Sequence, residues 1–223
     1  MTLQGVQWAI RIPRERFESL RSEESFRQAL ALGRFLNSVR FVQHGLLEGK
    51  SNQPAGARQR ISGFLFLAGT LYEGLELIRR MAKHFRNLEA WKRSMTPILQ
   101  DQLFDRLFAK SLAPLRNQAV FHFTEDAVVE PLRHCDLEEL VFVAGFEERQ
   151  GELFYELSDL LALDVFIDEY SSADQQLQRA EVLMERTTRL AAQVAEAAEV
   201  VLNEYVQSNG FTVTHSAESG GAV

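Results

Sequence analysis

The chain lacks several features that would narrow its function at once. It has a single cysteine, Cys135, among 223 residues, which excludes a disulfide within the chain and fits a reducing cytoplasm. No run of about 18 uninterrupted apolar residues occurs, so no transmembrane helix is expected. Arg11, Arg14 and Arg16 interrupt the region where a secretory signal peptide would need an apolar core. These absences predict a cytoplasmic protein without a membrane-spanning segment.

Metal-ligand patterns are also scarce. The sequence contains no His-x-x-x-His pair and no Cys-x-x-Cys pair. His134 beside Cys135 supplies only two neighbouring donors, whereas a structural zinc site uses four ligands. We therefore expect neither a metal site nor a cofactor.

Charge is distributed unevenly along the chain, whose net charge is -7. Residues 1–116 carry 19 Lys and Arg against 10 Asp and Glu, whereas residues 117–223 carry 5 against 21. An acidic protein is not a typical nucleic-acid binder, but its basic half could hold a polyanion locally. The two halves could equally pair with each other, within one chain or between chains.

Apolar periodicity predicts a mostly helical chain. Hydrophobic residues make up 46% of the sequence, which is typical of globular domains. Residues 15–48 and 58–86 are each predicted to form one long helix because apolar positions recur every three or four residues. The composition of residues 49–57 predicts a loop between them. Residues 173–207 predict a long C-terminal helix that Asn209-Gly210 stops.

The middle of the chain has a more mixed pattern. Pro97 is predicted to open a helix that continues to about Lys110, and Pro114 to occupy the first position of another helix. Two short runs rich in β-branched and aromatic residues, within residues 140–157, predict a small β-hairpin. A buried helix could carry the same residues. Residues 158–169 are predicted to return to helix.

These elements predict an all-α fold with a small β-hairpin insertion and a long C-terminal helix. We expect one helical domain over residues 1–207. Residues 208–223 are rich in Ser, Gly and Thr and are expected to form a disordered tail.

The chemically richest segment is Arg116-Asn117, followed by His122. Arginine binds phosphate with a planar fork, histidine moves protons near neutral pH, and asparagine both donates and accepts hydrogen bonds. If Pro114 begins a helix, Arg116 lies near free N–H groups that favour an anion. Residues six apart on an ideal helix do not face each other, and about 9 Å of rise separates them. The site therefore needs an irregular helix, or two copies meeting across a two-fold axis.

These residues suit the cleavage of RNA without a metal. The 2′-hydroxyl could attack the adjacent phosphorus, with His122 as general base or acid. Arg116 would stabilise the charge that develops in the transition state, and Asn117 would orient the phosphate or the histidine. Alternatively, Arg116 forms a surface salt bridge and His122 is a core histidine between two phenylalanines.

A second group of candidates lies on the polar face of the predicted helix 58–86. Arg79, Arg80 and Lys83 could follow an RNA backbone, or could be ordinary solvent-facing charges. Glu73 and Glu76 could line the same cleft or be solvated, and Glu76 lies within reach of Arg80.

The motif Leu115-Arg116-Asn117, with His122-Phe123 after four intervening residues, resembles the HEPN superfamily (higher eukaryotes and prokaryotes nucleotide-binding). The superfamily's signature is an arginine, a polar residue and, after a short gap, a histidine on a helix of an all-α protein. Residues 64–76 resemble its abortive-infection branch. The resemblance covers about residues 20–170, although only the motif is specific.

The resemblance implies an antiparallel helical bundle of HEPN type. It also implies a dimeric, metal-independent endoribonuclease of a toxin–antitoxin or antiviral system, with Arg116, Asn117 and His122 as catalytic residues. Some members pair with a nucleotidyltransferase antitoxin, which makes that enzyme or another antitoxin a candidate partner. The tyrosine that such an antitoxin modifies is replaced here by Thr124. Other members are not catalytic, so a module that binds a nucleotide or a partner protein is the alternative function.

Overall fold

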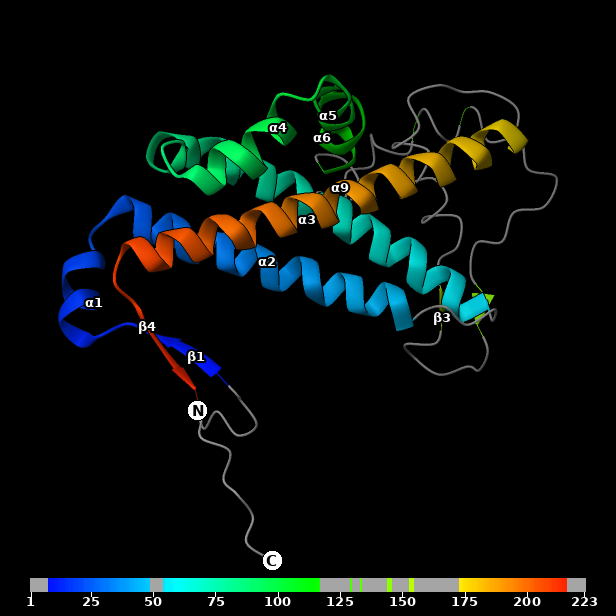
Figure 1. Cartoon of the computed structure of the whole chain (residues 1–223). Coiled ribbons are helices and arrows are strands. Elements are labelled where there is room, and N and C mark those ends of the chain that lie inside the picture. The colour runs from blue at the N-terminus through cyan, green and yellow to red at the C-terminus, as the bar shows by residue number, and fades with distance from the viewer. Residues whose placement is uncertain are drawn as a thin grey trace, which may run out of the picture.

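The computed structural model describes residues 8–48, 54–116, 129, 133, 144–145, 153–154 and 173–215. Most of this part of the chain is helical, and its strands are short. Three long helices form the frame: α2 (Glu24–Glu48), α3 (Pro54–Phe85) and α9 (Ala173–Ser208). Helix α2 runs antiparallel to both α3 and α9 (Figure 1). The all-α class predicted from periodicity and the long C-terminal helix are confirmed.

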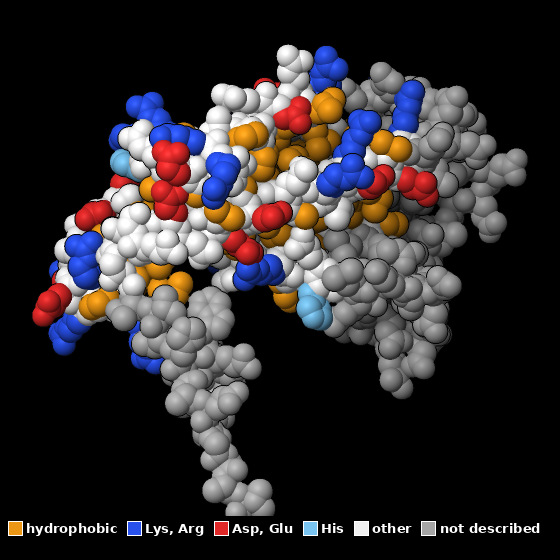
Figure 2. All heavy atoms as spheres, viewed as in Figure 1, with side chains coloured by type: hydrophobic (Ala, Val, Ile, Leu, Met, Phe, Trp, Pro, Cys, Tyr) orange, Lys and Arg blue, Asp and Glu red, His pale blue; other side chains and the backbone are white. Residues whose placement is uncertain are grey.

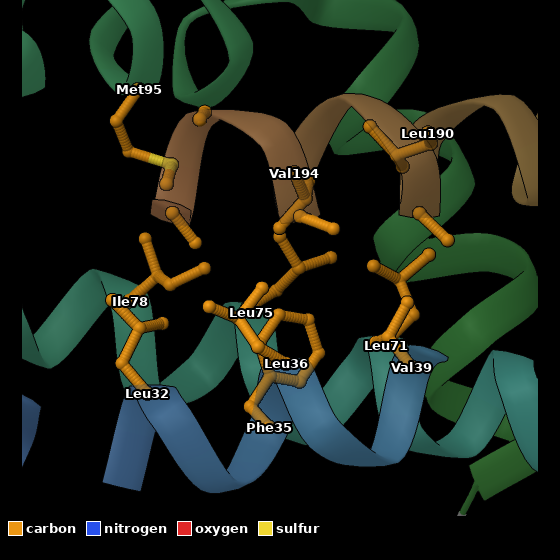
Figure 3. Close-up of a cluster of buried hydrophobic side chains, with 14 of the residues drawn as sticks. Leu32, Phe35, Leu36, Val39, Leu71, Leu75, Ile78, Met95, Leu190 and Val194 are labelled. Atoms are coloured by element: carbon orange, nitrogen blue, oxygen red, sulfur yellow. The ribbon is translucent and has the colours of Figure 1, made fainter. Parts of the chain in front are cut away.

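The core lies where the apolar faces of these three helices meet. Side chains from α2, α3 and α9 point toward one another, and a neighbouring helical segment contributes Met95 (Figure 3). The labelled members are fully or almost fully buried: Leu32, Phe35, Leu36, Val39, Leu71, Leu75, Ile78, Met95, Leu190 and Val194. Burial of this kind stabilises the fold by about 1.5–3 kcal/mol for each large apolar side chain.

The prediction of one helix over residues 15–48 is wrong, because the chain turns at residues 21–23. Helix α1 (Arg14–Leu20) ends there and α2 begins at Glu24. The Glu23 amide donates to the Leu20 carbonyl at 2.8 Å, and the Arg27 guanidinium donates to the Ser22 carbonyl at 2.9 Å. Both contacts satisfy backbone groups that the break would otherwise leave unpaired. The predicted loop over residues 49–57 is also too long, since α3 begins at Pro54.

Two prolines lie inside helical stretches rather than at their starts, which corrects the predictions for Pro97 and Pro114. The first stretch covers residues 89–99 and contains η1 (Trp91–Met95) and α4 (Thr96–Leu99). The second covers residues 102–116 and contains α5 (Gln102–Leu107), η2 (Phe108–Leu112) and α6 (Ala113–Leu115).

Both η segments are π-helical, and each precedes its proline. A proline in a helix clashes with the carbonyl four residues earlier. That residue is Arg93 for Pro97 and Lys110 for Pro114, and both lie within the wider π turns. The π turns therefore accommodate the prolines without ending the helices.

Helix α9 holds the start of the first of these stretches in place. The Glu204 carboxylate accepts hydrogen bonds from the backbone amides of Glu89, at 3.1 Å, and Ala90, at 2.5 Å. These amides belong to a helix start, where N–H groups have no partner within the helix. Glu204 thus caps a helix more than 100 residues earlier in the chain.

The C-terminal end of α9 confirms the predicted stop at Asn209-Gly210. Gly210 has φ +69°, a left-handed conformation that suits glycine. The Gly210 amide donates to the Gln207 carbonyl and the Phe211 amide to the Val206 carbonyl, which is the hydrogen-bond pattern of a Schellman cap.

The tail predicted to be disordered from residue 208 is ordered through His215. Strand β4 (Thr212–His215) pairs antiparallel with β1 (Trp8–Arg11), with Trp8 opposite His215. Figure 1 shows this ribbon beside α1. Threonine and valine favour strands, but only a partner about 200 residues away completes the pairing.

The small β-hairpin is confirmed within residues 140–157. Strand β2 (Ala144–Gly145) pairs antiparallel with β3 (Leu153–Phe154). The predicted helix at 158–169 lies outside the described residues. The assignment of residues 1–207 to one domain stays a prediction.

Helix α3 meets a criterion for membrane spans that is less strict than an uninterrupted apolar run. Its segment Ile61–Phe85 is long and apolar enough to cross a membrane by length and composition alone. Of its apolar window, 56% is buried inside the protein. The central helix of a packed bundle has the same composition, so this segment is weak support for a membrane span.

Candidate functional site

Arg116 lies several turns after the start of the helical stretch 102–116 and not near a helix start. The anion site proposed from free N–H groups after Pro114 is therefore wrong. Instead, the Arg116 Nε donates to Glu73 Oε1 of α3 at 2.6 Å. The Arg116 side chain is 29% exposed, so the guanidinium is half-buried beside α3.

An aromatic pair lies between Arg116 and a second arginine. The Arg116 guanidinium carbon is 5.8 Å from the centre of the Tyr72 ring. Tyr72 stacks on Phe108, with ring centres 4.7 Å apart and an interplanar angle of 9°. On Phe108, the Arg79 guanidinium carbon lies 3.9 Å from the ring centre. We call Arg116, Tyr72, Phe108 and Arg79 the cation–aromatic stack.

Carboxylates balance both cations of the cation–aromatic stack. Arg79 contacts Glu76 at 3.3 Å and Asp105 of α5 at 3.2 Å, and Arg116 contacts Glu73. The prediction that Glu76 pairs with Arg80 is thus corrected to Arg79. Cation–aromatic and exposed ionic contacts each contribute about 0.2–1 kcal/mol. Together they fasten the stretch 102–116 to α3 and orient Arg116.

The other two basic candidates have different surroundings. Arg80 is exposed, and no partner for it occurs among the residues that the structure describes. Lys83 lies 3.6 Å from Glu24 of α2, which also contacts His84 at 3.1 Å. The hydrogen bond from His84 and the charge of Lys83 lower the pKa of the Glu24 carboxyl. Arg79 and Lys83 therefore each have an acidic neighbour, whereas Arg80 has none within the described part of the chain.

The remaining motif residues, Asn117 and His122, lie outside the described residues. The roles predicted for them stay predictions. Within the described part of the chain, no group of three or more His, Cys, Asp or Glu side chains could hold a metal ion.

Sequence reasoning missed Tyr72 and Phe108 and left the role of Glu73 open. The residues three and four positions before Arg116 are Leu112 and Ala113, so no acidic partner precedes it on its own helix. The partner had to come from elsewhere, and the sequence alone did not favour Glu73 over other carboxylates. The one local signal was the spacing of Tyr72, Glu76 and Arg79, which places these side chains on one face of α3. Such a face can contact a second helix.

Comparisons with protein-family models, with curated proteins and with solved structures find no match for this chain. The fold and the site therefore define only a broad class. It is a mostly helical protein in which the cation–aromatic stack fastens the helical stretch 102–116 to α3.

Replacing Arg79 by alanine should lower the free energy of unfolding by about 1–2 kcal/mol. The variant loses the contact with Phe108 and two ionic contacts. Arg80→Ala on the adjacent position is the matched control and should change stability by less than about 0.5 kcal/mol. Urea denaturation followed by circular dichroism measures both. Equal effects of the two substitutions would show that the stack adds nothing to stability.

Proposed function

We propose that the chain is a metal-independent endoribonuclease of HEPN type that acts in a toxin or antiviral defence system. The observation that carries the proposal is the orientation of Arg116, the first residue of the Arg-Asn…His motif. Glu73 and Tyr72 orient its guanidinium in a half-buried position. Preorganised charge of this kind is the largest single contribution in many enzymes, because it needs no rearrangement during the reaction.

In the proposed reaction, the substrate's own 2′-oxygen attacks the adjacent phosphorus. A new O2′–P bond forms and the P–O5′ bond breaks, which leaves a 2′,3′-cyclic phosphate and a free 5′-hydroxyl. His122 takes the proton from the 2′-hydroxyl or delivers one to the leaving 5′-oxygen. Arg116 stabilises the added negative charge on the phosphoryl oxygens, and Asn117 orients the phosphate. Arg80, with Arg79 and Lys83 beside it, contacts the RNA backbone.

The test of this reaction is cleavage of an RNA oligonucleotide in EDTA. We expect cleavage to continue and to yield a 2′,3′-cyclic phosphate, detected by mass spectrometry. The same oligonucleotide with one 2′-deoxy substitution should resist cleavage at that nucleotide, because the nucleophile is missing. Cleavage of the deoxy substrate at the same rate would rule out the mechanism, as would loss of all cleavage in EDTA.

We also expect a homodimer in which the motif segments of two copies lie near the two-fold axis. The reason is the poor geometry between Arg116 and His122 on a single straight helix. Light scattering at micromolar concentration should give twice the chain's mass of 25.4 kDa. A fully active monomer would contradict the composite site.

The alternative function is a non-catalytic helical module that binds a nucleotide or a partner protein. The contact between Arg116 and Glu73 favours it, because a paired carboxylate already neutralises the arginine. Binding of RNA without cleavage, unchanged in His122→Ala, would select this alternative. Under either function we propose a nucleotidyltransferase or another antitoxin as the candidate partner. We also propose that the protein acts in the cytoplasm.

A further inference from the structure

A groove of about 380 Å³ lies between α9 and the helical segments on either side of Asp101. Its apolar lining comes from Ile98 and Phe104 on one wall and from Leu190, Ala197 and Val200 on the other. Figure 2 shows apolar side chains at the floor of the hollow between α5 and α9. The α9 wall spans residues 190–200, which is about 15 Å at 1.5 Å per residue. The groove thus follows about three turns of α9 and has apolar side chains on both walls.

The polar residues at the groove give it a negative charge. Asp101 and Glu196 contribute carboxylates from opposite walls, and none of the described residues that line the groove is a lysine or an arginine. The Asp101 carboxylate accepts a hydrogen bond from the Leu103 amide at 2.8 Å, as the N-cap of α5. This bond fixes one of the two charges at the edge. An occupant that complements the groove therefore combines an apolar face with positive charge.

We propose that this groove docks a short amphipathic helix of a partner protein, whose apolar side chains lie on the groove floor and whose Arg or Lys side chains face Asp101 and Glu196. Small-molecule sites enclose most of their ligand, whereas this groove is partly open to solvent. Its 15 Å wall matches about ten residues of helix, and a helix in an apolar groove is a common mode of peptide recognition. The proposal does not depend on ribonuclease activity.

Three synthetic peptides of about 18 residues, above the length at which isolated helices are only marginally stable, test the proposal with the full chain. The first carries a leucine stripe flanked by arginines, the second has glutamates in place of the arginines, and the third has serines in place of the leucines. Fluorescence anisotropy should show that the first peptide binds at least about tenfold more tightly than the second or the third. Only the first peptide has both the leucines that contact the apolar floor and the arginines that complement the two carboxylates. Equal binding of the three peptides, or none by the first, would overturn the proposal.

Variants of the chain then locate the binding site. Glu196→Gln and Asp101→Asn should each weaken the binding of the first peptide by about threefold. Asparagine at position 101 retains a side chain that can cap α5. Gln193→Trp fills the groove from its exposed rim and should abolish binding. Glu181→Gln, an exposed α9 carboxylate outside the groove, is the matched control and should have no effect.

Two results would reassign the groove. Binding that persists in Gln193→Trp, with the fold intact by circular dichroism, would place the peptide elsewhere. Self-association in sedimentation experiments that Gln193→Trp abolishes would make a second copy of this chain the occupant in place of a partner protein.

Discussion

Replacing His122 by alanine is expected to slow RNA cleavage by about 10²–10⁴-fold, the usual contribution of a general acid–base group. Arg116→Ala should slow it by about 10²–10³-fold, because it removes preorganised charge from the transition state. Asn117→Ala should cost less than either, since this side chain only orients the phosphate. Initial rates of cleavage of a labelled RNA, in EDTA, measure all three.

The contact between Arg116 and Glu73 provides the control for these variants. Arg116→Ala removes the positive charge and also breaks a 2.6 Å ionic contact with α3. Glu73→Gln breaks the same ionic contact but retains the arginine. If Arg116 acts on the phosphate, Glu73→Gln should slow cleavage far less than Arg116→Ala. Equal losses in the two variants would mean that the arginine matters only as part of the structure.

The fold of each variant needs a separate check. Phe121 and Phe123 flank His122, so the histidine could be a core residue. Circular dichroism and urea denaturation should show that His122→Ala keeps its helical content and most of its stability. If the inactive variant is also unfolded, His122→Asn or His122→Gln, which retain a polar side chain, should be folded and still inactive. A folded and active variant would contradict the proposed role.

Replacing Gly74 by alanine is expected to destabilise the fold by about 2 kcal/mol. A Cβ atom at this position would lie 2.1 Å from Cε2 and 2.4 Å from Cδ2 of Phe35, far inside van der Waals contact. The Phe35 ring is only 6% exposed and is packed among core side chains (Figure 3). Overpacking of a core costs about 1–3 kcal/mol or more and outweighs the gain of about 1 kcal/mol from replacing a helical glycine. Thermal denaturation should show a fall of about 4–8 °C in the midpoint temperature.

Gly33→Ala is the matched control for Gly74→Ala. Gly33 also lies within a long helix, α2, but apart from its own helical turn no atom of the described residues would lie within 4 Å of an added Cβ. Alanine there should raise stability by up to about 1 kcal/mol through helix propensity alone. Combining Gly74→Ala with Phe35→Leu should restore part of the lost stability, because the smaller side chain leaves room for the new methyl group. A similar response at the two glycines would mean that α2 and α3 do not approach closely at Gly74.

The sequence by itself determined the elements that depend on neighbouring residues. The 3–4 spacing of apolar residues predicted α3 and α9, and predicted α2 as part of a longer helix that also included α1, because this spacing forms one apolar face on any helix. Asn209-Gly210 predicted the end of α9, since glycine adopts a left-handed conformation at low cost. The short runs around residues 140–157 predicted the hairpin, which pairs residues close in the chain. Each of these signals is local.

Only the tertiary structure decided the features that join distant residues. Strand β4 is ordered because β1, about 200 residues earlier, supplies its hydrogen-bond partners. Arg116 is oriented by Glu73 and Tyr72 of a different helix, and nothing in the spacing of these residues favoured that pairing over others. The two helical glycines look alike in the sequence, yet only Gly74 faces a buried ring. Packing chooses among contacts that many positions could make, and this choice depends on the three-dimensional arrangement of the helices.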